Sequence, residues 1–190
     1  MRYATIMLAL LVTTGCTNQS APVGSEPRNE PVEMAPAPRA VLGQCGEERN
    51  PQRWVEACTK VIESGRLDPQ ERAWALTIRA QGYLEEDPSD RDRALADAEA
   101  AVRTDPNNGY AYRTRGQAYA LMGQDRKALA DYDAAIRINP SEGYHYFVRG
   151  SEYWALRQTD AADRDFARAV ELDPKLKWIV ETLKNMRTLP

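Results

Sequence analysis

The side chains that most often carry out chemistry in proteins are sparse in this sequence. It has one histidine, His145, so neither a histidine-based catalytic triad nor a site with several histidine ligands can form within one chain. Asp160, Asp163 and Asp165 make an acidic edge, but nearby arginines offset it and the glycine turn of a calcium loop is missing. Phosphate-binding loops and nucleophile elbows are absent too. We therefore predict no catalytic residue, no metal site and no cofactor.

Two of the three cysteines, Cys45 and Cys58, lie thirteen residues apart. In an exported chain this spacing favours a disulfide, and a disulfide that closes a loop of that size would stabilise the fold by roughly 3 kcal/mol. The alternative is a pair of buried free thiols. A zinc site is not indicated, because no Cys-x-x-Cys pattern occurs.

The N-terminus has the features of an export signal. A positive start at Met1 and Arg2 is followed by an uncharged apolar run at 4–12, too short to span a bilayer, and then by small residues. We predict a signal peptide over residues 1–15. Gly15 followed by Cys16 resembles the lipobox of bacterial lipoproteins, although Thr13 stands where that family prefers leucine.

The lipobox resemblance implies that Cys16 carries the lipid anchor and attaches the chain to a membrane. Because Thr17 follows instead of an aspartate, it also implies an outer-membrane lipoprotein that faces the periplasm. The alternative is an ordinary secretory signal and a soluble periplasmic or secreted protein. Residues 16–44 contain five prolines and no aromatic residue, so we predict a disordered, lipid-anchored linker there.

The bulk composition excludes one class of partner. The chain has 190 residues, of which 28% are charged and 43% apolar, enough for one globular domain with tails. Its formal net charge is −3, without the basic excess that nucleic-acid binders show. We expect no nucleic-acid partner.

The rest of the sequence is organised by one repeat period, the interval that separates Gly82 from Gly116 and again Gly116 from Gly150. Small residues, an aspartate and a proline recur at this interval over three copies without a gap. The aligned positions are Gly82, Gly116 and Gly150; Ala94, Ala128 and Ala162; Asp97, Asp131 and Asp165; Ala101, Ala135 and Ala169; and Pro106, Pro140 and Pro174. The glycines predict places where two helices cross closely. Each proline follows a capping residue, which predicts the start of the next helix.

These positions resemble the tetratricopeptide repeat, a helix–turn–helix unit. The match is complete in the second copy, with Tyr112, Gly116, Tyr119, Ala128, Tyr132, Ala135 and Pro140, and the third copy repeats it. The resemblance implies an all-α solenoid of antiparallel helix pairs. We predict repeats at 75–108, 109–142 and 143–176, a degenerate first unit at 45–74 and a C-terminal capping helix within 177–190. Asp68 and Glu71 have the spacing of a capping box.

The resemblance also implies that the first helix of each repeat lines a groove for a protein partner. The positions that face this groove in the family fall here on Arg79, Tyr83, Tyr110, Arg113, Thr114, Gln117, Tyr144, Phe147 and Ser151. Aromatic and arginine side chains dominate many interfaces, and arginine can hold a carboxylate.

We therefore predict a non-enzymatic scaffold or adaptor of the bacterial cell envelope that binds an acidic partner segment. The alternatives are a self-associating envelope assembly component and a binder of a non-protein envelope ligand such as glycan.

Overall fold

The computed structural model describes Cys45 and residues 51–86 and 88–186. Within these residues the chain is helical and has no strand. The predicted signal peptide, the linker and Cys16 lie outside the described residues. The helices are α3 (Pro51–Glu63), α4 (Pro69–Glu86), α5 (Arg91–Thr104), α6 (Gly109–Leu121), α7 (Asp125–Ile138), α8 (Gly143–Ala155), α9 (Thr159–Leu172) and α10 (Lys177–Met186), with 3-10 turns at Pro88–Asp90 and Pro174–Leu176.

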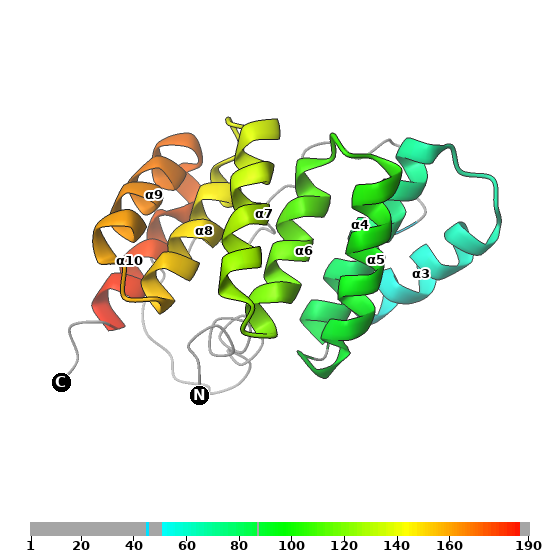
Figure 1. Cartoon of the computed structure of the whole chain (residues 1–190), viewed down its shortest axis with the longest axis horizontal. Coiled ribbons are helices and arrows are strands. Elements are labelled where there is room, and N and C mark those ends of the chain that lie inside the picture. The colour runs from blue at the N-terminus through cyan, green and yellow to red at the C-terminus, as the bar shows by residue number, and fades with distance from the viewer. Residues whose placement is uncertain (1–44, 46–50, 87, 187–190) are drawn as a thin grey trace, which may run out of the picture.

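The helices form successive hairpins that stack in chain order (Figure 1). α4 pairs with α5, α6 with α7 and α8 with α9, while α3 packs on α4 and α10 closes the far end beside α9. The first helices of the pairs also contact one another, α4 with α6 and α6 with α8. The predicted all-α solenoid with a capping helix is confirmed. Among the described residues, no helix is long and apolar enough to cross a membrane.

The helix starts follow local capping rules, and they correct one expectation. Asp68 and Glu71 form the predicted capping box, in which each side chain accepts a hydrogen bond from the backbone N–H of the other. Asn108 caps α6 by accepting from the N–H groups of Tyr110 and Ala111. The predicted starts at Pro106 and Pro140 are wrong, because α6 and α8 begin three residues later.

The glycines mark close helix crossings, as the sequence predicts. A side-chain carbon on Gly116 would lie 2.7 Å from the Tyr132 ring, and one on Gly150 would lie 3.0 Å from the Phe166 ring. Both aromatic rings are buried. The α6–α7 and α8–α9 hairpins are therefore each closed by an aromatic ring of the second helix that packs against a bare backbone on the first.

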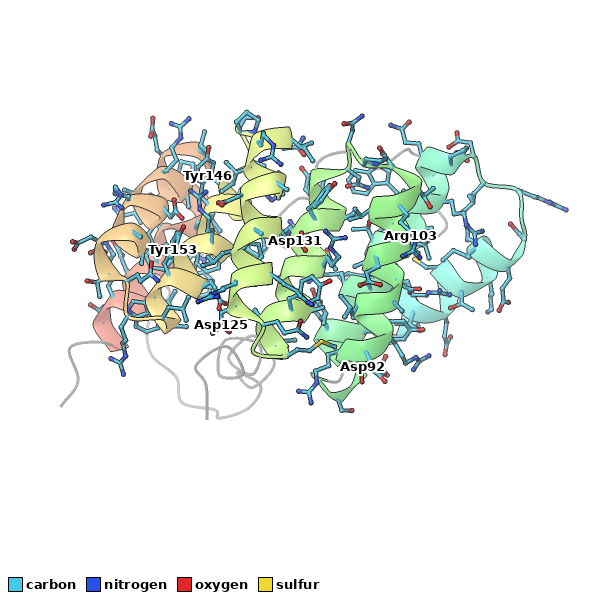
Figure 2. The ribbon with its side chains drawn as sticks, in the orientation of Figure 1. Asp92, Arg103, Asp125, Asp131, Tyr146 and Tyr153 are labelled. Carbon is cyan, nitrogen blue, oxygen red and sulfur yellow. The ribbon has the colours of Figure 1, made fainter. Side chains whose placement is uncertain are left out.

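A recurring ion pair ties the two helices of each hairpin together. Arg115 on α6 donates two hydrogen bonds to the carboxylate of Asp131 on α7, one from Nε at 2.8 Å and one from Nη2 at 2.7 Å. Asp131 is labelled in Figure 2. Arg149 on α8 donates two hydrogen bonds to Asp165 on α9 in the same way, each at 2.7 Å. In both hairpins the arginine precedes its aspartate by 16 residues. Such two-point contacts fix the geometry as well as the charge.

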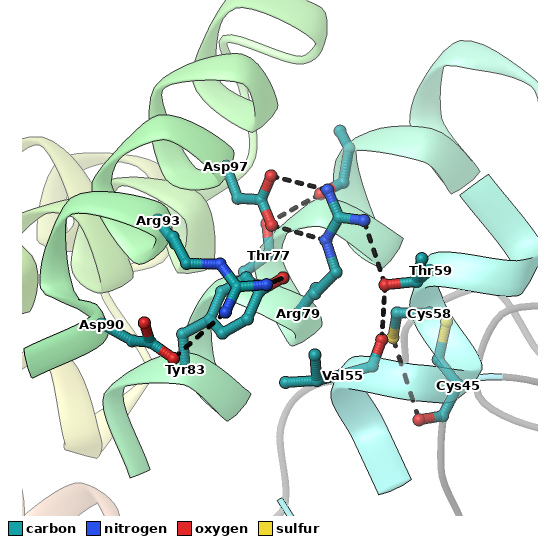
Figure 3. A network of polar contacts seen from close by, with 11 residues as sticks. Cys45, Val55, Cys58, Thr59, Thr77, Arg79, Tyr83, Asp90, Arg93 and Asp97 are labelled. Atoms are coloured by element: carbon teal, nitrogen blue, oxygen red, sulfur yellow. Dashed lines mark hydrogen bonds and ion pairs between the residues drawn. The ribbon is translucent and has the colours of Figure 1, made fainter. Parts of the chain in front are cut away.

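The equivalent pair in the first hairpin shows that α4 is displaced in sequence. Arg79 on α4 donates hydrogen bonds to the Asp97 carboxylate from Nε at 2.6 Å and from Nη2 at 2.8 Å (Figure 3). It precedes that aspartate by 18 residues, however, instead of 16. The difference of two, 18 against 16, lies in the connection between α4 and α5, which holds an extra 3-10 turn. Ala80 packs with Ala94 and Ala98 on α5 and so takes the place of Gly116. The gap-free register predicted for this helix is wrong.

Candidate functional site

The candidate site is the surface of the first helices α4, α6 and α8, which we call the first-helix face. It is defined by Gln81, Glu85, Arg113, Gln117, Tyr144 and Ser151. The three helices that carry these side chains are neighbours, because α4 contacts α6 and α6 contacts α8. Each comes from the side of its helix that is not occupied by the arginine of the ion pair.

Arg113 lies on α6, the middle one of these helices, and is held between aromatic rings. Its guanidinium carbon lies 5.3 Å from the centre of the Tyr110 ring and 5.0 Å from that of Tyr144, which comes from the next repeat. Arg113 is buried, with 3% of its surface exposed, whereas Tyr144 is half-buried. Flanking aromatic faces stabilise a cation and fix its position. Positive charge is thus placed just beneath an accessible aromatic side chain.

Glu85 brings a carboxyl group toward this arginine from the preceding repeat. Burial raises the pKa of Glu85, while the hydrogen bond from Gln81 and the charge of Arg113 lower it in part. The Gln81 amide donates this hydrogen bond at 2.7 Å. Burial also raises the pKa of Tyr144, so its hydroxyl stays protonated as a hydrogen-bond donor near neutral pH.

Two glutamine oxygens on this face have unused hydrogen-bonding capacity. Gln81 Oε1 and Gln117 Oε1 are buried and have no hydrogen-bond partner within the described part of the chain. With the two-residue displacement of α4, these glutamines occupy equivalent positions in successive repeats. A buried acceptor without a donor costs roughly 1–3 kcal/mol. The arrangement therefore favours a ligand that brings N–H groups to both oxygens.

The structure separates the nine predicted groove residues into three groups. Gln117, Tyr144 and Ser151 are half-buried on the first-helix face. Tyr110, Arg113, Thr114 and Phe147 belong to the same helices but are buried. Arg79 and Tyr83 lie elsewhere, against α5.

The displacement of α4 explains this correction for Arg79 and Tyr83. Arg79 is occupied by Asp97 on α5 and by Thr59 on α3 (Figure 3), and Tyr83 lies under the guanidinium of Arg93, 4.2 Å from its ring centre. Both residues are therefore structural. Sequence reasoning missed Gln81 and Glu85, which take part in the face instead. The spacing of Arg79 and Asp97 was the available signal.

Comparisons with known proteins bear on the repeats. Family models described as tetratricopeptide repeat match residues 109–142 and residues 146–176. These two segments are tetratricopeptide repeats. A search of curated proteins finds no match.

Solved structures with tetratricopeptide repeats resemble this chain over about two thirds of its length. A crystal structure of MamA is 26% identical, with a TM-score of 0.52, and the match covers 66% of this chain and 70% of that one. The first tetratricopeptide domain of Spaghetti (RPAP3), bound to the HSP90 peptide SRMEEVD, is 26% identical, with a TM-score of 0.51, and the match covers 62% of this chain and 97% of that one. These likenesses support the helical repeat architecture.

The two described cysteines and the histidine, which are not part of the first-helix face, are buried in the fold. Cys45 and Cys58 are fully buried free thiols, and Cys58 Sγ lies 3.8 Å from the Cys45 carbonyl oxygen (Figure 3). The predicted disulfide is therefore not formed in the structure. The alternative that the sequence left open, two buried free thiols, is observed instead. His145 is also fully buried. No group of three or more histidine, cysteine, aspartate or glutamate side chains in the described residues is arranged to hold a metal ion.

Proposed function

We propose that the chain is a non-enzymatic scaffold that binds an extended segment of a partner protein along the first-helix face. The observation that carries this proposal is the pair of buried side-chain oxygens of Gln81 and Gln117, which accept no hydrogen bond from the described residues. Both glutamine side chains are half-buried, so a rotation of each amide can bring its oxygen to the surface, where backbone N–H groups of an extended segment donate to it. Side chains of the segment then contact Tyr144.

Charge selects among such segments. The positive charge of Arg113 beneath the Tyr144 ring favours an acidic side chain near that ring, because opposite charges attract more strongly where the protein partly excludes water. The similar RPAP3 domain is bound to a peptide whose sequence, SRMEEVD, is rich in carboxylates. That likeness supports an acidic segment here too.

The export features of the N-terminus add a location to this proposal. A lipid on Cys16 and a linker over 16–44 would hold the repeats at the bacterial outer membrane, on its periplasmic side. The scaffold would then bring a soluble partner to the envelope surface without any new contact between the partner and lipid.

Replacing Tyr144 tests the binding face. An affinity-tagged full chain with Tyr144→Ala should recover about tenfold less of its partner from cells than the unchanged chain, because truncation of an interface aromatic typically costs more than 1 kcal/mol. Tyr146→Ala is the matched control, since Tyr146 is on the same helix but its hydroxyl bonds to Pro140 (Figure 2 marks this tyrosine). Equal recovery with both variants would show that the face does not bind.

Replacing Cys16 tests the location. The unchanged chain should sediment with membranes and incorporate labelled fatty acid, whereas Cys16→Ser should do neither, because acyl chains contribute about 0.8 kcal/mol for each buried CH₂. Cys45→Ser should keep the label and thereby show that the lipid is on Cys16. An unchanged chain that stays soluble and unlabelled would contradict the anchor.

A further inference from the structure

One aromatic position recurs on every first helix and continues onto the capping helix. Tyr110, Tyr144 and Trp178 follow one another at intervals of one repeat period. Trp74 takes the same position on α4 once the two-residue displacement of that helix is included. The Trp74 and Tyr110 rings are in contact, with centres 5.0 Å apart. The column therefore runs along the whole set of repeats.

α10 continues the sequence register of the first helices. Val180 and Leu183, which stand one repeat period after Tyr146 and Arg149, are buried against the last hairpin with 5% and 3% exposure. Trp178 and Asn185, which are equivalent to the site positions Tyr144 and Ser151 of α8, are exposed on α10. Trp178 thus extends the first-helix face by one repeat.

The exposure of Trp178 is out of place for a capping helix. Trp74 is 8% exposed and Tyr110 3%, whereas Trp178 is 46% exposed and is the exposed large apolar side chain of the described residues. A terminal helix of a repeat stack normally keeps a polar outer face for solubility. The neighbouring charge of Lys177 is paired with that of Glu181, with 3.9 Å between Nζ and Oε1. The surface around it therefore favours an apolar ligand over a charged one.

We propose that Trp178 is a second contact point for the partner segment and receives a bulky apolar side chain such as Leu or Phe. This inference rests on the proposed function, in which the acidic part of the segment lies near Tyr144 and Arg113. Packed helices lie about 8–10 Å apart, and an extended chain advances about 3.3 Å per residue. The recognised segment therefore carries its apolar residue about three positions from its acidic residue, on the side toward α10.

A peptide selection on the full chain tests this spacing. A displayed library of short random peptides should yield binders with an acidic residue and, about three positions away, a bulky apolar residue. The affinity of one such synthetic peptide, measured by fluorescence anisotropy, should fall about tenfold with Trp178→Ser. Changing the apolar residue of the peptide to alanine should weaken binding to the unchanged chain but not to Trp178→Ser. That loss of coupling would place the two side chains in contact.

The variants distinguish failure of this inference from failure of the proposed function. If Trp178→Ser keeps the affinity while Tyr144→Ala loses it, the first-helix face binds but Trp178 does not take part. If neither variant changes the affinity, or no peptide is selected, both proposals fail. Tyr146→Ala is the aromatic control, and Trp178→Gln replaces the serine variant if circular dichroism shows a loss of helix.

Discussion

On acidification from pH 8 to pH 5, His145 is expected to lower the free energy of unfolding by about 2 kcal/mol. The imidazole has 0% exposure, and neither of its nitrogens has a hydrogen-bond partner among the described residues. The Tyr110 ring packs against the imidazole in an edge-to-face arrangement, with ring centres 5.2 Å apart. Burial, and secondarily the charge of Arg113, lower the pKa of His145 from 6.5 to about 3. The folded protein therefore keeps this side chain neutral.

The direction of the effect follows from which state takes up the proton. Below pH 6.5 the unfolded chain binds a proton at His145, while the folded protein does not until the pH nears 3. Stability that is present above pH 6.5 is lost as the pH falls, by about 1.4 kcal/mol per pH unit. The loss ends near pH 3, where the folded protein also binds the proton.

Urea unfolding of the unchanged chain and of His145→Leu, followed by circular dichroism between pH 8 and pH 5, isolates this contribution. Carboxylates that titrate in the same range are common to both proteins and cancel in the difference. At pH 8 the leucine variant should be as stable as the unchanged chain or about 1 kcal/mol more stable, because it buries no unpartnered nitrogen. At pH 5 the advantage of the variant should have grown by about 2 kcal/mol. Parallel pH profiles would contradict a neutral buried histidine.

The sequence predicts the fold well because its repeated residues report on packing. Gly116 and Gly150 recur where the backbone of one helix touches an aromatic ring of the next, and the structure has those contacts. The predicted capping helix is also present as α10, which buries Val180 and Leu183. Spacing carries this information because a side chain on a helix can meet its neighbour only at fixed positions.

The sequence predicts the first-helix face less well than the fold, because the members of this face depend on which side of each helix packs against a neighbouring helix. A displacement of two residues turns an α-helix by about 200°. Aligning Gly82 with Gly116 therefore assigned Arg79 and Tyr83 to the face and left Gln81 and Glu85 out of it. The burial of some candidate residues is a second reason why the sequence does not predict the first-helix face fully. Thr114 and Phe147 occupy the right helices, but neighbouring helices cover them, which spacing within one repeat cannot show.

The other large effect is expected from the ion pair that ties α6 to α7. Asp131→Ala should lower the free energy of unfolding by about 3 kcal/mol, because it leaves the guanidinium of Arg115 without its carboxylate inside a helix crossing. The Asp131 side chain is 8% exposed and that of Arg115 21%, so water replaces the lost contacts only in part. Urea unfolding followed by circular dichroism measures the change.

A double substitution separates the loss of the pair from simple loss of packing. Arg115→Leu together with Asp131→Ala should be within about 1 kcal/mol of the unchanged chain, since replacing a buried pair by apolar residues is often neutral. The chain itself supplies the precedent, because Leu183 stands one repeat period after Arg149 and is buried where α10 meets the last hairpin. Asp90→Ala, which removes the half-buried partner of the exposed Arg93, should cost well under 1 kcal/mol. If Asp131→Ala costs no more than that surface control, the recurring arginine–aspartate pairs do not hold the hairpins together.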